Sequence, residues 1–532
     1  MPHPGGKGAG PRTLCERREG AILRSRTLYH HRKVFASIRP SPRPDQSMHS
    51  PRNPFPGNRN RFFGIRAVAL AIVTVSCPLP LRAHDDHPHA PPLAVAPAEA
   101  HRPSRLPDRI ILSPSADPAH GMAVAWRTST DAPHGFAQLA AATHGPELRD
   151  RAVTIPARTE ALTTDLGPSL CHAVEFADLE PGTRYAYRIG DGTNWSEWLQ
   201  FETASAEPAR FQFVHFGDAQ NDILSMWSRV VREAGRHAPR AQLMIHSGDL
   251  VNAGDNDAQW GEWFRAGSFL HAQIPSLPIP GNHEYVKVGE GDAATSRLSH
   301  HWRRQFALPE NGPPGLEETC LSVVYGDTRI VALNSNEKLA EQAVWLDELL
   351  TRDRRRWVVC SFHHPIFSAA KNRDNAPLRA AWKPVFDKHG VDLVLQGHDH
   401  VYGRTGLVPQ GDPPATIENA PTGVNRVDPT SGAVYVVSVS GPKHYDVSDS
   451  HPLMERLGED TQLFQIIDIE RDELHFESRT AIGALYDGFT LRKRATGPNE
   501  LIVREDLLPE RRRPPKPAAP EPAAAAVGSD RP

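Results

Sequence analysis

Phe211-Gln212-Phe213-Val214-His215-Phe216-Gly217-Asp218 decides the fold, because it is a strand-like apolar run that ends on a glycine and an aspartate. Further apolar runs along the chain also end in Gly, Asp, Asn or His. They lie within residues 243–249, 278–284, 357–365 and 391–400. A glycine in such a place lets the chain turn sharply and brings the next side chain close to its neighbours. We therefore expect these segments to share one polar site.

Helical patterns lie between these runs. Apolar residues recur at helical spacing over 223–235, a second helical segment covers 339–350, and a third covers 377–389 and is capped by Gly390. Strands that alternate with helices predict an α/β core. Open α/β sheets bind ligands at the carboxyl ends of their strands, which is where most of the polar motifs fall.

The motif residues have the chemistry of a metal centre. Together they supply two aspartates, one asparagine and three histidines, with further histidines in reserve. That inventory can hold two metal ions side by side, a recurring device for hydrolysing phosphate esters. Hard oxygen ligands with imidazole suit Fe, Mn or Zn. One such aspartate alone would more often be a turn or helix cap, so the prediction rests on the ordered set.

Residues 104–205 have a different pattern, with short strands that alternate every two residues and are separated by turns. Pro181-Gly182 marks a turn just before Tyr185, and an apolar strand at 122–126 ends on Trp126. Strands spaced in this way predict a β-sandwich. No residue set in this segment looks catalytic, so we expect a packing or positioning module.

The two regions resemble known families. The segment 179–187 and Trp126 are similar to the strand corner and the buried core tryptophan of fibronectin type III domains. The five ordered motifs resemble the calcineurin-like metallophosphoesterases, within them the purple acid phosphatase branch. The resemblance covers nearly all of 104–495. It implies an N-terminal all-β sandwich at 104–205, followed at 209–495 by an α/β metallophosphoesterase domain of the α/β/β/α sandwich type.

The same resemblance implies roles for individual residues. The implied metal ligands are Asp218 and His400 on the first metal, Asp249 as the bridge, and Asn282, His363 and His398 on the second metal. His283 is implied to donate a proton to the leaving group or to steady the transition state. For His364, substrate contact and support of a metal ligand both stay open.

Two positions depart from the family pattern. Purple acid phosphatases carry a tyrosine three residues after the bridging aspartate, and its bond to ferric iron gives them their colour; this chain has Asn252 there. Other branches place a histidine two residues after the first aspartate, where this chain has Gln220. We expect a protein without the purple band. Asn252 or Gln220 is then a weak ligand or holds a water.

These assignments predict an exported, metal-dependent phosphoesterase that hydrolyses phosphomonoesters by attack of a metal-bridging hydroxide. Its cofactor would be two divalent or mixed-valence metal ions, which lower the pKa of a shared water toward neutrality. Two alternatives stay open: a phosphodiesterase or nucleotide-hydrolysing enzyme with the same centre, and a binding or adhesion protein whose metal domain is vestigial. The candidates for the substrate pocket are His301, Arg303, Asn372, Arg373 and Tyr402.

The ends of the chain predict export. Residues 1–83 have the pattern of a leader with a secretory signal, because an apolar run at 67–81 follows a basic flank and precedes Ala83. That run is too short for a stable membrane span, which needs roughly 20 residues. Acylation of Cys77 and an uncleaved anchor are the alternatives. We expect a Pro/His-rich linker at 84–103, a disordered Pro/Ala-rich tail at 509–532, and a periplasmic or secreted protein.

The bulk composition limits the partners. The 532 residues carry a formal net charge of −3, which gives no basic character for binding a nucleic-acid scaffold. None of the five cysteines forms a CxxC pair, which argues against a zinc–thiolate site and favours buried thiols. The expected partner is a small phosphate ester, and the sequence leaves the oligomeric state unknown.

Overall fold

The structure is a computed structural model, and it describes residues 94–291, 294–409, 411, 432–448 and 453–514. The expected leader at 1–83, the first ten residues of the expected linker and the chain from 515 onward lie outside the described residues. In the part of the chain that is described, no helix is long and apolar enough to cross a membrane. Cys171, Cys320 and Cys360 are free and buried, as expected for thiols that pack in a core.

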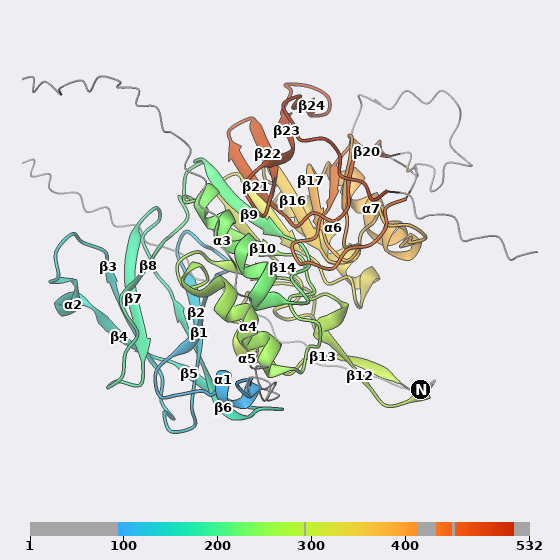
Figure 1. Cartoon of the computed structure of the whole chain (residues 1–532). Helices are drawn as coiled ribbons and strands as arrows, with labels where there is room; N and C mark the ends of the chain where they lie inside the picture. The colour runs from blue at the N-terminus through green and yellow to red at the C-terminus, as the bar shows by residue number, and fades with distance from the viewer. Residues whose placement is uncertain (1–93, 292–293, 410, 412–431, 449–452, 515–532) are drawn as a thin grey trace, which may run out of the picture. The chain divides into compact units, whose positions relative to one another are not determined.

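A β-sandwich forms the N-terminal part of the described chain (Figure 1). Its first sheet has the order β1 (Asp108–Pro114), β2 (Met122–Thr128), β6 (Gly167–Phe176), β5 (Arg158–Thr164). Its second sheet has the order β4 (Val153–Pro156), β3 (Phe136–Ala141), β7 (Arg184–Gly190), β8 (Leu199–Glu202). Two one-turn helices, α1 (Pro97–Ala100) and α2 (Leu148–Arg151), accompany the strands. This architecture confirms the all-β expectation.

The sandwich core contains the residues that the sequence singled out. Trp126 is buried there together with Leu112, Phe176 and Tyr187. The hydroxyl of Tyr185 accepts a 2.9 Å hydrogen bond from the backbone N–H of Glu180, which closes the corner at the Pro-Gly turn. A tyrosine that bonds back to the preceding backbone fixes the entry of a sandwich strand in this way.

The first sheet of the α/β domain has seven strands. Its order is β11 (Ser276–Pro278), β10 (Leu243–His246), β9 (Phe211–Phe216), β21 (Leu463–Glu470), β22 (Glu473–Thr480), β23 (Leu485–Arg492), β24 (Glu500–Val503). Strands β9, β10 and β11 are parallel, and β21 to β24 are antiparallel to their neighbours. The sheet therefore continues through β24, beyond the expected domain end at residue 495.

The second sheet also has seven strands. Its order is β14 (Leu321–Tyr325), β15 (Thr328–Ala332), β16 (Trp357–Phe362), β17 (Leu393–Gln396), β19 (Val434–Val437), β18 (Tyr402–Thr405), β20 (Met454–Gly458). Strands β15, β16, β17 and β19 are parallel. A separate hairpin, β12 (Tyr285–Val288) with β13 (Thr295–Leu298), follows the third polar motif and extends away from the sheets (Figure 1).

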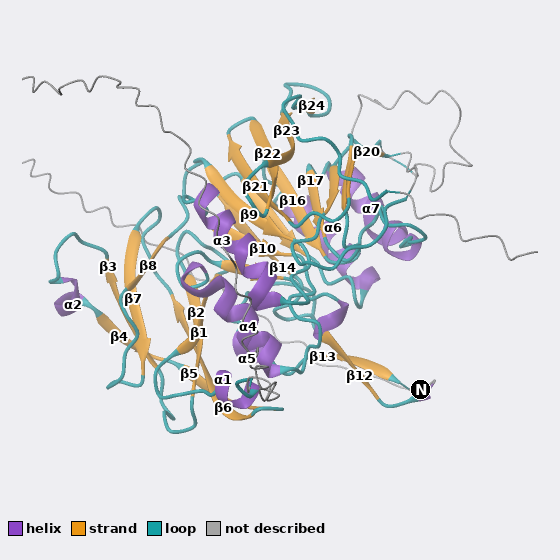
Figure 2. Ribbon diagram, viewed as in Figure 1, coloured by secondary structure: helices purple, strands orange, loops and turns teal. Residues whose placement is uncertain are grey.

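Helices cover the outer faces of the two sheets (Figure 2). The helices on the side of the first sheet are η1 (Ile223–Trp227), α3 (Ser228–His237), α4 (Asp257–Gly267) and η2 (Ser268–Leu270). Those on the side of the second sheet are α6 (Leu339–Arg352) and α7 (Ala376–His389). The short η3 (Asn282–Glu284) and α5 (Trp302–Gln305) flank the hairpin. Helix α7 ends at Gly390, whose φ of 60° is the left-handed cap expected from the sequence.

Two apolar cores hold together the four layers of the α/β domain, which are the two sheets and the helices on their outer faces. The larger core lies between the facing sheets, with Val214 and Ile467 from the first and Val359 and Val436 from the second, and it continues under α3 and α4. The smaller core lies between the second sheet and helices α6 and α7. Strands buried on both faces are apolar at nearly every position, as β16 and β17 are. The expected α/β/β/α arrangement is confirmed.

The start of the expected tail is ordered against the α/β domain. The backbone N–H of Leu457 donates a 2.8 Å hydrogen bond to Glu510, and Arg513 forms ion pairs with Asp446 and Asp460. The expectation of a disordered tail from residue 509 is therefore wrong for residues 509–514. The sequence pattern missed this because arginine and glutamate next to proline have the composition of a disordered segment.

Candidate metal centre

The motif residues meet where the parallel strands of both sheets end. Asp218 follows β9 and Asp249 follows β10, while His363 follows β16 and His398 follows β17. Asp218 also forms a parallel bridge with Val439, just beyond the end of β19 in the other sheet. The backbone N–H of His398 donates a 2.6 Å hydrogen bond to Oδ1 of Asp218. The two sheets are therefore fastened to each other at the edge that carries the polar residues.

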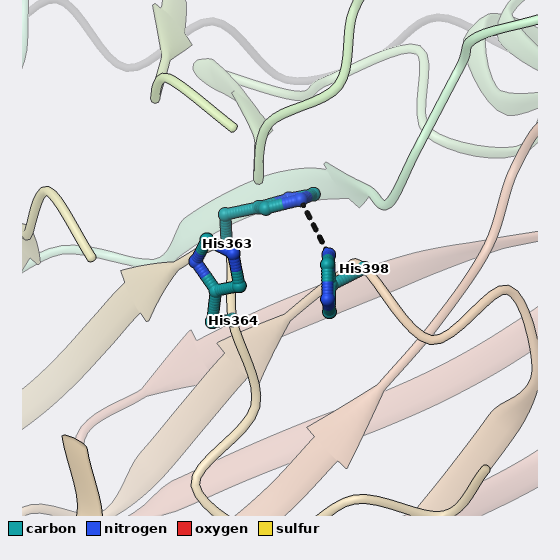
Figure 3. Close-up of side chains that lie close together, drawn as sticks. All are labelled: His363, His364 and His398. Carbon is teal, nitrogen blue, oxygen red and sulfur yellow. Dashed lines mark hydrogen bonds between the residues drawn. The ribbon is translucent and has the colours of Figure 1, made fainter. Parts of the chain in front are cut away.

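One half of the cluster is centred on Nε2 of His363. That nitrogen lies 3.1 Å from Oδ1 of Asn282, 3.1 Å from Nδ1 of His398 and 3.2 Å from Oδ1 of Asp249. Figure 3 shows the imidazoles of His363 and His398 approaching each other, with His364 beside them. An N–H at Nε2 of His363 can be donated to only one of these three neighbours. The lone pairs of the other two then face this nitrogen without a proton between them.

The other half joins Asp218, Gln220 and His400. Nε2 of His400 lies 3.0 Å from Oδ2 of Asp218 and 3.0 Å from Nε2 of Gln220. The Gln220 amide also donates a 2.8 Å hydrogen bond to Oδ2 of Asp249. Asp249 thus faces both halves, one oxygen toward each. The six residues that the sequence selected as ligands come together, and Gln220 lies among them.

Two of the imidazole rings are held in one orientation by backbone carbonyls. Nδ1 of His363 lies 2.9 Å from the carbonyl of Ser247, and Nδ1 of His400 lies 3.0 Å from the carbonyl of Lys443. A carbonyl can only accept, so each Nδ1 carries a proton and each Nε2 is directed into the cluster. Histidines that bind metals are held in this way in most metal sites.

These residues fit a pair of metal cations. Asp218, Asp249 and His363 bring ligand atoms within 4.8 Å of one another, and so do His363, His364 and His398. Among the described residues, Oδ2 of Asp218 and Oε1 of Gln220 are buried and have no hydrogen-bond partner. Buried oxygens are rarely left unsatisfied in native proteins, and bound ions are one reason for exceptions. Cations between the converging oxygens and nitrogens would satisfy all of them.

The charges of the cluster support the same fit. Burial alone would lower the pKa of His363, but the carboxylates of Asp249 and Asp218 outweigh it and raise that pKa to about 10. Burial would raise the pKa of Asp218, yet His400 and His363 hold it well below its ordinary value. The two buried carboxylates therefore attract positive charge, which a proton on His363 supplies when no metal is bound.

The backbone adopts constrained conformations around the cluster. Asp249, His398 and His400 have φ values of 50°, 72° and 45°, in the left-handed region. Gly248 has a φ of 90°, and a Cβ atom there would lie 2.5 Å from Nδ1 of His363. Such conformations are held against their strain by surrounding structure, and they gather at functional sites.

His283 and Glu284 connect the third motif to the second. The carboxylate of Glu284 is fully buried and accepts hydrogen bonds from the backbone N–H groups of Asp249, Leu250 and Gly281 at 2.7–2.9 Å. Burial and the charge of Asp249 raise the pKa of Glu284 to about 8, against the effect of these donors. Glu284 lies in the third polar segment, 278–284, and was assigned no role from the sequence, although an acid directly after Asn282-His283 was a usable signal.

The ring of His283 is directed toward the cluster. Its Nδ1 lies 2.6 Å from the carbonyl of Asn252, and its Nε2 lies 3.8 Å from Oδ2 of Asp249. The side chain is 29% exposed, so the same nitrogen is accessible to a bound molecule. A proton fixed on Nδ1 by the carbonyl leaves Nε2 free to exchange protons.

A second group of side chains borders His364 and His398. The hydroxyl of Ser335 lies 2.8 Å from Nδ1 of His364, and burial lowers the pKa of His364 to about 3, with help from His363. Arg373 contacts the carbonyl of His398 at 3.4 Å and Oδ1 of Asp399 at 3.3 Å. Its guanidinium lies over the ring of Tyr445 at 4.6 Å. Tyr445 had no recognisable signal in the sequence.

Other candidates from the sequence lie elsewhere. Asn252 is exposed, and its Oδ1 accepts a 3.3 Å hydrogen bond from Asn221 rather than joining the cluster. Tyr402 is buried against Asp487, and Arg303 pairs with Glu317 on the surface. His301 is buried against Asp257 and takes part in a different cluster.

Comparison with known proteins agrees with this geometry. Residues 211–402 match the family described as calcineurin-like phosphoesterase, and residues 107–203 match the purple acid phosphatase N-terminal domain. The chain carries a calcineurin-like phosphoesterase domain behind a purple acid phosphatase N-terminal domain. A purple acid phosphatase from seeds of yellow lupin (Lupinus luteus) has the same fold as the two domains, with a TM-score of 0.61 at 18% identity over 74% of this chain and 75% of that one.

Curated relatives match part of this chain at modest identity. An uncharacterized protein of Mycobacterium tuberculosis is 28% identical over 362 residues, which are 60% of this chain and 66% of that protein. Acid phosphatase type 7 of Danio rerio is 26% identical over 269 residues, which are 44% of this chain and 57% of that protein. The chain thus spans just under two thirds of the first relative and less of the second.

Proposed function

We propose that this chain is an exported phosphomonoesterase that works with a dinuclear metal centre. The observation that carries the proposal is the convergence of two carboxylates, an amide and three imidazoles at the strand ends of two facing sheets, described above. Hydrolysis of phosphate esters is the chemistry to which paired metals are best suited. The names of the relatives, among them an acid phosphatase, support the same class of reaction.

The metal ligands follow from the two halves of the cluster. Asp218, His400 and Gln220 would hold the first cation, and Asn282, His363 and His398 the second. Asp249 would serve both, since its two oxygens face opposite halves. Bound cations of Fe, Mn or Zn supply an acidified water and neutralise phosphate oxygens. Glu284 and the Ser247 and Lys443 carbonyls keep the ligands in position.

His283 is the residue that we assign to the leaving group. Its Nδ1–H donates to the Asn252 carbonyl, so the ring cannot turn away, and Nε2 presents a proton toward the cluster. Protonation of a departing alkoxide by a positioned imidazole typically contributes 10²–10⁴ in rate, as an order of magnitude.

The substrate's phosphate would contact His364 and Arg373. Burial keeps His364 neutral, and Ser335 fixes its Nδ1, so Nε2 is the atom left for a ligand. The positively charged guanidinium of Arg373 lies over the ring of Tyr445 and beside His398. The ammonium group of Lys443 lies over the same ring, 5.4 Å from its centre. Positive side chains beside a metal pair favour a phosphomonoester, which is a dianion, over a phosphodiester, which carries one negative charge. Each positive side chain adds attraction for the second negative charge of the monoester.

A cavity of about 440 Å³ is lined in part by Asn252, whose backbone carbonyl contacts Nδ1 of His283. Asn221, Asp222, Gln259 and Glu262 are among its lining residues. Its two acidic side chains disfavour a further phosphate in the leaving group, so we propose a neutral or amine-bearing alcohol rather than a nucleoside polyphosphate. A diesterase with the same centre is the second candidate, because the cavity has room for a larger ester.

Export rests on the expected secretory signal before residue 84, and the protein would then act in the periplasm or outside the cell.

The experiment is p-nitrophenyl phosphate hydrolysis by the metal-loaded protein, beside Asp249→Ala and the exposed control Asp150→Ala. Activity in the parent and the control but not in Asp249→Ala supports the proposal. Bis(p-nitrophenyl) phosphate, assayed in parallel, separates the two candidates. If the loaded parent hydrolyses neither ester, the proposed function is wrong and a binding role gains support.

A further inference from the structure

A second group of metal-binding side chains lies outside the centre described above. Asp255, His300 and His301 each place one ligand atom within 4.8 Å of the others. Asp255 lies in the loop before α4, and the two histidines lie between β13 and α5. We propose that these residues form a separate, structural site for one Zn²⁺ ion. The inference is independent of the proposed function.

The clearest indication of a cation site is the set of acceptors around the hydroxyl of Ser299. Its oxygen lies 2.6 Å from the carbonyl of Gly254, 2.9 Å from Oδ1 of Asp255 and 3.3 Å from Nδ1 of His301. Nδ1 of His300 lies 3.0 Å from the same Asp255 oxygen. The serine has one proton for three acceptors. A cation among these lone pairs would satisfy those that the proton cannot.

Each donor is oriented by a partner on its far side. Nε2 of His301 lies 3.3 Å from Oδ1 of Asp257, and Nε2 of His300 lies 3.1 Å from the carbonyl of Thr163. Arg297 occupies Oδ2 of Asp255 at 2.5 Å, which leaves Oδ1 as a single ligand atom. Histidines that bind zinc usually donate their other N–H to a carboxylate or a carbonyl in this manner.

The partner of His301 is itself firmly held. Asp257 is buried and pairs with Arg109 at 2.7 Å and Arg127 at 3.2 Å. Its negative charge favours a proton on Nε2 of His301, which leaves Nδ1 with a lone pair toward the Ser299 hydroxyl. A histidine binds a metal in its neutral form, through the ring nitrogen that carries no proton.

Two imidazoles and one carboxylate match the ligands of zinc, which takes four in a tetrahedral arrangement. The Ser299 hydroxyl or a water would complete the set. His300 is exposed, so an ion has a path to the site, whereas His301 is buried and rigid. The arrangement differs from the surface pair of His120 and Asp117, which is not part of any three-residue cluster of metal-ligand type within the described chain.

The site would fix the base of the β12–β13 hairpin. Asp255 follows three residues after Asn252, whose carbonyl holds the ring of His283. At the other end, the backbone N–H of Ser299 donates a 2.8 Å hydrogen bond to the carbonyl of Glu284. An ion shared by Asp255 and His300 would therefore tie together the two chain segments that flank His283 and Glu284.

The test measures metal content rather than activity. The full chain is loaded with Zn²⁺, freed of excess ion and analysed by inductively coupled plasma mass spectrometry, beside His300→Ala and the control His120→Ala. We expect His300→Ala to bind one equivalent fewer than the parent and His120→Ala to match the parent. Equal zinc content in the parent and His300→Ala would overturn the proposal.

A second measurement separates loss of the site from loss of the fold. Asp249→Ala disables the main centre, and in that background added Zn²⁺ should still raise the melting temperature. The double variant Asp249→Ala/His300→Ala should have the same melting temperature without metal, and at least a tenfold weaker apparent affinity for Zn²⁺. A zinc-induced shift that is unchanged in the double variant would contradict the site.

Discussion

Oδ1 of Asp218 accepts a 2.6 Å hydrogen bond from the backbone N–H of His398, and these residues follow strands of different sheets. The carboxylate is thereby held by one oxygen, and its other oxygen is left toward His400. The spacing of the cluster thus depends on how the two sheets pack, not only on the loops that carry the ligands. Substitutions in the shared core should disturb metal binding as well as stability.

His283→Ala should lower kcat by about 10²-fold or more, because His283 is assigned to protonate the leaving group. The metal content should stay unchanged, because His283 contacts Asp249 and Asn252 but is not itself a proposed metal ligand. The loss should be smaller for p-nitrophenyl phosphate than for an alkyl phosphate, since p-nitrophenolate departs without a proton. Steady-state kinetics on both esters, with metal analysis of the same samples, checks this. An equal loss of metal and activity would make His283 structural.

Arg373→Ala should raise KM for a phosphomonoester by roughly tenfold, about 1.4 kcal/mol, with a smaller change in kcat. The reason is that its guanidinium is held beside His398 by Asp399 and Tyr445, ready for a phosphate oxygen. Arg303→Ala is the matched control, because Arg303 pairs with Glu317 on the surface. An unchanged KM in Arg373→Ala would remove this residue from the substrate site.

The iron-loaded protein should lack the purple absorption band, because Asn252 stands where the coloured enzymes have their tyrosine ligand. Its side chain is exposed and bonded to Asn221. The visible spectrum of the oxidised, iron-loaded protein measures this directly. Asn252→Tyr, which restores a phenol at that position, is the positive control and should gain a band. A purple band in the parent would refute the prediction.

Stability should fall as the pH drops from 6.5 toward 4, in part because of His172. This ring is 1% exposed, is stacked on Trp126 at 5.2 Å, and has its pKa lowered to about 4 by burial. Between these two pH values the unfolded chain binds a proton that the folded chain does not. The free energy of unfolding is therefore highest above pH 6.5. Protonation of His172 in the unfolded chain lowers it by about 3 kcal/mol in total as the pH falls below that value.

Urea denaturation of the parent and His172→Gln at pH 7.5 and pH 4.5 checks this prediction. The difference in unfolding free energy between the two pH values should be smaller in the variant. Other buried histidines, such as His271, contribute equally to both proteins and cancel in the comparison. Parallel losses in the parent and the variant would show that His172 does not titrate as proposed.

The sequence was informative wherever a local signal coincided with a structural requirement. An apolar run that ends on Gly-Asp or Gly-His has few alternatives to a buried strand and a sharp turn, so Asp218, Asp249 and His398 could be assigned to one polar site at strand ends. Gly390 likewise marked the end of α7. These features depend on neighbours only a few residues away.

What the sequence could not supply are contacts between distant segments. Nothing local indicates that Tyr445 lies under Arg373, or that the carbonyl of Lys443 orients His400. Polar loop residues have no periodicity, so His301 and Tyr402 were chosen for the substrate pocket although both are buried in other surroundings. Such pairings are decided by tertiary packing.

The carboxylate of Asp218 and the backbone of His398 are 180 positions apart in the chain, yet they must meet before the ligands are in place. A ribosome releases Asp218 and Asp249 long before His398 and His400. The growing chain therefore cannot present the full set of donors to a metal, and the ions must be acquired after most of the chain has been made. The proposed metal pair would thus be bound only by fully folded molecules, and the amount of metal tightly bound at this centre should measure the fraction of the preparation that has folded to completion.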